Sequence, residues 1–116
     1  MLEKIKQLYG DFHDALITEV NYFNGYNFDD NLLEETVLTV KISCYNLSRP
    51  YGSRELIEIQ FKNVEKFIYE KTEGAIFETM MKEDDGKIIT DFFYENDHPY
   101  FVVICERISY AVLKQN

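Results

Sequence analysis

The residues best suited to chemistry lie near the start of the chain, where the segment FHD places Phe12, His13 and Asp14 side by side. A histidine beside a carboxylate can carry protons or bind a metal, because the acid orients the imidazole and stabilises its charged form. The same residues suit a structural role, since Asp11 or Asp14 can accept hydrogen bonds from backbone amides where a helix gives way to a strand. We expect mainly a structural corner in which His13 bridges two elements, with a binding site as the first alternative and a catalytic or metal site as the second.

A second polar residue stands out in the apolar segment near the C-terminus. Strand alternation would place Glu106 on one face with Ile104 and Ile108. A buried carboxylate needs a hydrogen-bonding partner, and His13 and Arg107 are the candidates. A His13–Glu106 pair would form a buried polar anchor or the floor of a pocket. In the alternative, Glu106 lies at the end of its strand and reaches water.

Sequence signatures of common enzymes and cofactor sites are absent. The chain has no phosphate-binding glycine loop, dinucleotide-binding motif, zinc-protease motif or nucleophile elbow. The acidic segment 83–86 lacks the ligand spacing of a calcium loop. His98 precedes a proline in a polar turn, which predicts a solvated loop residue. We therefore expect no catalytic residue, no metal site and no cofactor.

The two cysteines, Cys44 and Cys105, are expected to be buried and reduced. They form no C-x-x-C motif and offer too few ligands for zinc. Reduced thiols are typical of a cytoplasmic protein, and a disulfide is the alternative. The N-terminus lacks the apolar core of a secretory signal, and no stretch reaches the roughly 20 apolar residues of a membrane helix. These features predict a cytoplasmic protein.

Length and composition predict a single folded domain spanning residues 1–116. Hydrophobic residues make up 46% and aromatic residues 16% of the chain, which is enough apolar surface to offset the entropy lost on folding. Twelve basic and 21 acidic residues give a net charge of −9. This charge disfavours nucleic acid and anionic membranes, because both bind positive surfaces. It suits a basic protein or a cationic ligand, unless it serves only solubility.

The elements that must position these residues follow from hydrophobic periodicity. Apolar residues at helical spacing predict a helix over 2–9, ended by Gly10. The period then changes, and residues 15–23 alternate as in a strand. Asn24-Gly25 favours a tight turn, which the polar residues 29–31 prolong into a loop.

Two further alternating segments, 36–45 and 55–61, predict strands joined by a surface loop over 46–54. Val64 and Phe67, three residues apart, indicate a bulge or a single helical turn before a further short strand. In the first segment one face carries Leu38, Val40, Ile42 and Cys44, and in the second the inward residues are Ile57, Ile59 and Phe61.

The second half of the chain carries the strongest turn signal. Asp85-Gly86 lies between the alternating segments 75–82 and 87–95, which predicts a hairpin with positive φ at the glycine. A polar turn over 96–99 leads to the most apolar segment, 100–113. Because this last strand is apolar on both faces, we expect it to lie in the middle of the sheet.

The predicted fold class is α+β and mostly β. It comprises a short N-terminal helix and an antiparallel meander of about six strands, since short connections cannot make parallel crossovers. The helix would cover one face while the sheet curls as a half-barrel or a sandwich-like layer.

Several segments resemble a group of small bacterial proteins of unknown or presumed immunity function. In that group an F-H-D-[SA]-x-I segment opens the first strand and a C-E-x-I segment lies in the last. The matching residues are Phe12, His13, Asp14, Ala15 and Ile17 in the first motif, and Cys105, Glu106 and Ile108 in the second. The resemblance implies a β-rich architecture and a role in neutralising a toxin, and it supplies no catalytic residue.

The function we expect is that of a non-enzymatic bacterial cytoplasmic binding protein, with an immunity protein against a basic toxin as its leading form. One alternative is a small-molecule-binding protein or modest enzyme with a pocket near His13 and Glu106. Another is a subunit of a larger assembly that uses an uncovered sheet edge or face. The candidate cluster, for binding or for structure, comprises Phe12, His13, Asp14 and Glu106.

Overall fold

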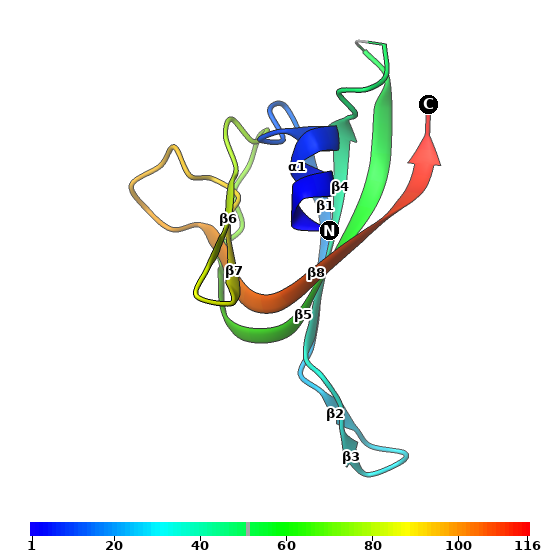
Figure 1. Cartoon of the computed structure of the whole chain (residues 1–116), viewed down its shortest axis with the longest axis vertical. Coiled ribbons are helices and arrows are strands. Elements are labelled where there is room, and N and C mark those ends of the chain that lie inside the picture. Colours follow the sequence, from blue (N-terminus) through cyan, green and yellow to red (C-terminus); the bar gives the residue numbers. More distant parts are fainter. Residues whose placement is uncertain (51) are drawn as a thin grey trace.

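A curled antiparallel sheet holds the N-terminal helix on its concave side (Figure 1). The structure is a computed structural model that describes residues 1–50 and 52–116, so that Tyr51, within the predicted loop 46–54, lies outside the described residues. The helix α1 spans Leu2–Tyr9, as predicted. Gly10 ends it with a φ of 62°, a backbone conformation that glycine adopts readily.

The main sheet has the strand order β1-β4-β5-β8-β7-β6, and all neighbours are antiparallel. β1 and β6 form its two edges, and the sheet is not closed into a barrel. The predicted fold class is therefore confirmed, with the half-barrel form of the curl. The strands are β1 (Leu16–Phe23), β4 (Val37–Tyr45), β5 (Arg54–Tyr69), β6 (Met80–Asp84), β7 (Lys87–Asp91) and β8 (Phe101–Gln115).

One connection departs from a simple meander. β5 neighbours β8 instead of β6, so the segment 70–79 leads the chain past two strands to the far edge of the sheet. The first residues of the predicted strand 75–82 belong to this connection. Their backbone bonds go elsewhere: Ile76 accepts from the Asp14 N–H and donates to the Ala15 carbonyl, both at 2.8 Å. The connection therefore holds the corner that contains FHD.

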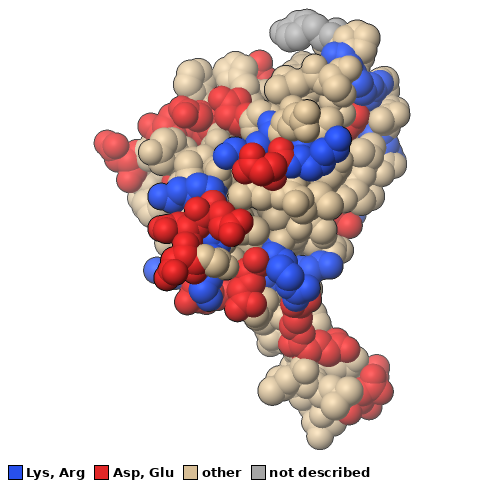
Figure 2. Space-filling view, viewed as in Figure 1, with Lys and Arg blue, Asp and Glu red and all other residues tan. Residues whose placement is uncertain are grey.

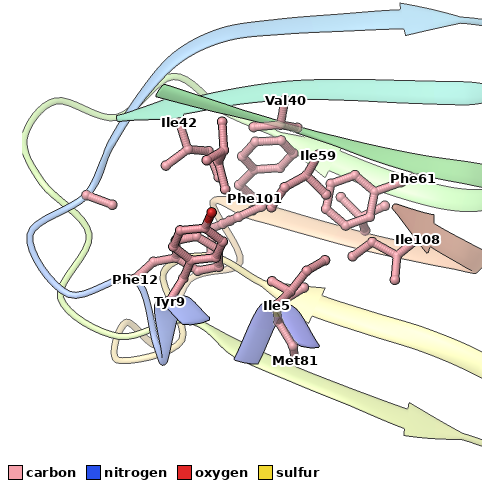
Figure 3. Close-up of a cluster of buried hydrophobic side chains, with 14 of the residues drawn as sticks. Ile5, Tyr9, Phe12, Val40, Ile42, Ile59, Phe61, Met81, Phe101 and Ile108 are labelled. Atoms are coloured by element: carbon pink, nitrogen blue, oxygen red, sulfur yellow. The ribbon is translucent and has the colours of Figure 1, made fainter. Parts of the chain in front are cut away.

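The core lies between α1 and the concave face of the sheet. Figure 3 shows Ile5 and Tyr9 of the helix pointing toward Ile59, Phe61 and Phe101 of the central strands. Residues of β4 and β5 alternate between buried and half-buried along the predicted strands 36–45 and 55–61. The predicted inward faces are thus confirmed, and they form one hydrophobic cluster with the helix.

Both cysteines belong to this core as free, buried thiols, which confirms the predicted reduced state. Burial raises the pKa of Cys44 to about 12 and that of Cys105 to about 11. Neither thiol is therefore activated as a nucleophile, because the reactive form is the thiolate.

β5 bends sharply where a bulge or helical turn was predicted. The register against β8 shifts between Val64 and Lys66, and Asn63 has a φ of 55°. The strand then continues to Tyr69 without a break. A bulge is the device that lets a long strand change direction while it stays in the sheet.

β8 lies between β5 and β7, which confirms its predicted central position. Its facing changes opposite the bend of β5: Cys105 and Ile108 are both buried, whereas Glu106 and Arg107 between them are exposed. The prediction that Glu106 shares a face with Ile104 and Ile108 is therefore wrong, because strict alternation does not hold through the bend.

The predicted hairpin at Asp85-Gly86 is confirmed and joins β6 to β7. The two residues have φ values of 50° and 77°. Positive φ at both central residues is what a two-residue type I′ turn requires, and an Asp-Gly pair supplies it at low cost.

A second hairpin projects from the body of the molecule along its long axis (Figure 1). It comprises the short strands β2 (Tyr26–Asn27) and β3 (Leu32–Leu33). Gly25 has the predicted positive φ, 95°, and a loop follows as predicted, but no tight turn forms at Asn24-Gly25 because the loop itself contains this hairpin. Pairing of β1 with β4 ends at Phe23 opposite Val37, and the chain continues outward before it turns back.

Candidate functional site

The FHD segment forms a tight corner between α1 and β1. Phe12 and Asp14 have φ values of 58° and 65°. Residues other than glycine, asparagine and aspartate rarely adopt this left-handed backbone conformation. Phe12 is 1% exposed, and its ring stacks on Tyr9 with centroids 5.7 Å apart. The corner is thus fixed by a buried aromatic side chain, as expected for a structural role.

His13 lies on the surface of this corner and ties it to the connection 70–79. Its Nδ1 donates to the Phe77 carbonyl oxygen at 2.9 Å, and its ring contacts the Phe77 ring edge-on. This hydrogen bond, followed by the nearby Asp14 carboxylate, raises the pKa of His13 above its ordinary value. The expected bridging role of His13 is confirmed.

The two aspartates of the corner act differently from each other. Asp11 Oδ1 accepts a hydrogen bond from the His13 N–H at 3.2 Å, which is the expected bond to the backbone. The Asp14 carboxylate instead lies 3.6 Å from Nε2 of the same histidine. What singles out Asp14 is its backbone, because aspartate tolerates the left-handed conformation better than most residues.

Replacement of Asp14 by alanine is expected to lower the free energy of unfolding by about 1 kcal/mol, since alanine is strained at positive φ. Asp14→Gly should destabilise the protein less, because glycine adopts this conformation freely. Urea denaturation of both variants measures the difference. If the glycine variant were as unstable as the alanine variant, the carboxylate and not the backbone would be what matters.

Glu106 does not join the FHD corner. Its side chain is 46% exposed and lies 3.9 Å from Lys87 Nζ, a weak surface ion pair. The neighbouring Arg107 pairs with Glu35 instead. Glu106 lines a shallow cleft beside the start of α1, whereas His13 lines a different one beside the end of β4. The structure therefore brings Phe12, His13 and Asp14 together and leaves Glu106 apart.

The polar centre that sequence reasoning missed is Glu55, the one buried acidic residue in the described part of the chain, at 2% exposure. Its carboxylate accepts a hydrogen bond from the Tyr9 hydroxyl at 2.8 Å and from Asn46 Nδ2 at 3.0 Å. Gln115 Nε2 and Arg49 Nη1 donate to it at 3.2 and 3.4 Å. Four donors, from the helix, from the loop 46–54 and from the last strand, thus meet at one carboxylate on β5.

The protonation of this centre is fixed by its partners. Burial by itself would raise the pKa of Glu55, but hydrogen bonds from Tyr9, Asn46, Gln115 and Arg49 outweigh burial and hold it below its ordinary value. Burial, and next the Glu55 carboxylate, raise the pKa of Tyr9 far above its ordinary value. The tyrosine therefore stays a donor and the glutamate an acceptor, so the pair works as an anchor and not as a proton exchanger.

No metal centre is found in the described residues, because no three His, Cys, Asp or Glu side chains are grouped to hold an ion. The second histidine, His98, is exposed as predicted and pairs with Glu70. Residues 1–50 and 52–116 contain no helix that is long and apolar enough to cross a membrane.

A further cleft lies between the edge strand β1 and the start of the connection 70–79. Its lining is mixed, with Val20, Tyr69 and Phe93 beside Glu19 and Lys71, and it contains neither histidine nor cysteine. The Glu19 carboxylate of this cleft pairs with Lys41 at 3.1 Å, and the rest of the lining offers a mixed polar and apolar contact surface.

Comparison with protein-family models, with curated proteins and with solved structures finds no match for this chain. Function must therefore be argued from the charge, burial and shape of the molecule. Of the 21 acidic residues only Glu55 is buried, so the excess of negative charge lies on the surface. That surface is the most distinctive chemical property of the protein.

Proposed function

We propose that this protein is a non-enzymatic cytoplasmic binding protein that recognises a basic protein, and that it serves bacteria as an immunity protein against a basic toxin. The observation that carries the proposal is the charge of the surface. The net charge is −9, and 20 of the 21 acidic residues face solvent at least in part. On the face shown in Figure 2, acidic side chains occur both on the body and on the projecting hairpin.

The titratable groups inside the protein support a binding role over catalysis. Glu55 is saturated by four donors, and both buried thiols have raised pKa values. His13 is exposed and already bonded to a backbone carbonyl. Glu55 and the two buried thiols are therefore unsuited to acid, base or nucleophilic catalysis.

The mechanism we propose has two parts. The negative field, which extends over about 8 Å at physiological salt, attracts a basic partner and speeds encounter. Packed contacts then slow dissociation, and exposed tyrosines such as Tyr22, Tyr69 and Tyr94 supply amphipathic surface for them. A toxin that acts on nucleic acid presents a positive surface of this kind, and covering that surface would block its substrate.

Capture of partners from the native host with the full chain as bait, followed by binding kinetics, tests the proposal. We expect a basic protein whose association rate falls about tenfold or more between about 0.05 and 0.5 M salt, because steering is screened. The dissociation rate should change much less, since packed contacts are not screened. Capture of a neutral metabolite alone, or binding that is indifferent to salt, would contradict the proposal.

A further inference from the structure

The projecting hairpin, residues 24–35, exposes large apolar side chains that the core does not use. Phe28 is 80% exposed and Leu33 is 85% exposed, the two highest values among the large hydrophobic residues of the described chain. Leu32 and Tyr26 of the same hairpin are 55% and 45% exposed. Single exposed apolar residues are common, but a cluster of them on a protruding element marks an interaction site.

Polar contacts within the hairpin, and not the side chains of Phe28, Leu32 and Leu33, hold its shape. Asn24, Asn27 and Asn31 each accept a hydrogen bond through the side-chain oxygen: the first two from the backbone N–H groups of Tyr26 and Asp30, and the third from the Tyr26 hydroxyl, at 3.0 to 3.3 Å. The tip is therefore ordered by polar contacts within the hairpin. An element that is ordered in advance loses less entropy on binding, which favours affinity.

The base of the hairpin depends on Gly25. Its φ is 95°, and a Cβ there would lie 2.5 Å from the Glu34 carbonyl oxygen. The Glu34 N–H donates to the Gly25 carbonyl across this close approach. A side chain at position 25 would separate the two strands, so the glycine sets the direction in which the tip projects.

The charge of the hairpin has one sign. It contains Asp29, Asp30, Glu34 and Glu35 and no lysine or arginine (Figure 2). Glu35 pairs with Arg107 on β8, whereas the other three form no ion pair with any residue that the structure describes. An apolar tip is thus surrounded by carboxylates that have no cationic partner within this chain.

We infer that the hairpin is the recognition element of the protein, and that it inserts Phe28 and Leu33 into an apolar cavity of a basic protein. Lysine and arginine side chains at the rim of that cavity would meet Asp29, Asp30 and Glu34. The inference rests on the proposed function and adds to it the surface that binds. A second copy of this chain fits the tip poorly, because the carboxylates of two hairpins would repel each other, and an anionic membrane is disfavoured for the same reason.

The test uses the basic protein that the wild-type chain captures from its host, purified and measured against matched variants. The double variant Phe28→Ser/Leu33→Ser removes the apolar tip, and Leu47→Ser is its control, since Leu47 is 65% exposed in the β4–β5 connection at the other end of β4. Two charges are removed by Asp29→Asn/Asp30→Asn. The matched control is Glu95→Gln/Asp97→Asn, which removes two exposed carboxylates from the loop between β7 and β8.

The apolar double variant is expected to dissociate about 30-fold faster or more, as for residues at the centre of an interface. The hairpin charge variant should associate several-fold more slowly and with a weaker dependence on salt. Both controls should bind within twofold of wild type. All four variants should keep the wild-type melting temperature, because the replaced side chains are exposed.

Failure of the inference is distinct from failure of the proposed function. If a basic protein binds the wild type and both hairpin variants equally, the proposed function is supported and the hairpin is not the binding surface. If the wild type captures no basic protein, the proposed function falls and the inference with it. Sedimentation of the wild type as a dimer that Phe28→Ser/Leu33→Ser disrupts would assign the tip to a second copy. Binding to phosphatidylcholine vesicles that this variant abolishes would assign it to a membrane.

Discussion

Glu55→Ala is expected to lower the free energy of unfolding by about 3–5 kcal/mol, the range for removing one partner of a buried ion pair. The substitution leaves the buried Tyr9 hydroxyl and the half-buried Asn46 amide without their acceptor, and it also removes the acceptor of the exposed Gln115 amide. It also leaves Arg49, whose side chain is only 27% exposed, without its counter-charge. Urea denaturation of the purified variant measures the loss.

Glu65→Ala is the matched control for this prediction. Glu65 lies on the same strand, is exposed, and pairs at 3.6 Å with Lys87 on the surface. Its removal should change the stability by no more than about 0.5 kcal/mol, because exposed ion pairs contribute little. Equal effects of the two substitutions would show that the buried network is not an anchor.

The pH dependence of the Glu55 contribution has a definite sign. Its pKa in the folded protein is lowered from the ordinary value of 4.5. The contribution is therefore fully present above the unfolded pKa and is lost as the pH falls through the lower folded pKa. Unfolding curves of the wild type and Glu55→Ala should accordingly converge in acid, and a difference that grows below pH 4.5 would contradict this account.

Phe12→Ala should lower the free energy of unfolding by a similar amount, about 3–5 kcal/mol, because it removes a fully buried aromatic side chain. The Phe12 ring contacts Tyr9 of the helix and Phe92 beyond β7, so its loss opens a cavity where three parts of the chain meet. The measurement is again the midpoint and slope of urea denaturation. An unchanged midpoint would mean that the FHD corner is not part of the core.

Phe28→Ala provides the comparison of the same residue type in the opposite environment. Phe28 is 80% exposed and Phe12 is 1% exposed. The Phe28 variant should therefore keep wild-type stability within about 0.5 kcal/mol. Together the two variants separate the aromatic residues that fold the protein from those available for binding.

Most of the secondary structure could be predicted because its determinants are local. Alternation along β4 predicted which residues are buried, and Asp85-Gly86 predicted a hairpin from the φ values that these two residue types tolerate. The helix over 2–9 and its end at Gly10 were predicted on the same grounds. In each case the identities of a few consecutive residues are enough to predict the local structure.

The polar centre at Glu55 could not be predicted because its donors come from distant parts of the chain. One local signal existed: continuing the alternation of Ile57 and Ile59 backward by one step places position 55 on the inward face. A carboxylate there has a high desolvation cost, and nothing nearby in sequence shows that Tyr9 and Gln115 will offset it. The inward position of Glu55 could therefore be predicted from the alternation, but the hydrogen bonds that offset its desolvation could not.

The predictions for the facing of Glu106 and for the turn at Asn24-Gly25 were wrong for a related reason. Alternation along β8 holds only until the sheet bends, and the bend is imposed by the bulge near Val64 on the neighbouring strand. Asn24-Gly25 has the residue types of a tight turn, yet strand pairing continues to Phe23 and directs the chain outward. Pairing between strands, which no single segment encodes, decided both outcomes.

The position of β8 between β5 and β7 has a consequence for how the protein reaches its fold. Glu55 lies opposite Gln115, 60 residues later in the chain, and the longest ladder of the sheet is built from such distant pairs. Sheets dominated by distant pairs fold slowly, in milliseconds to seconds, because the intervening loop must close first. During synthesis β5 therefore leaves the ribosome with one edge unpaired, and that edge stays open to other chains until β8 emerges to cover it.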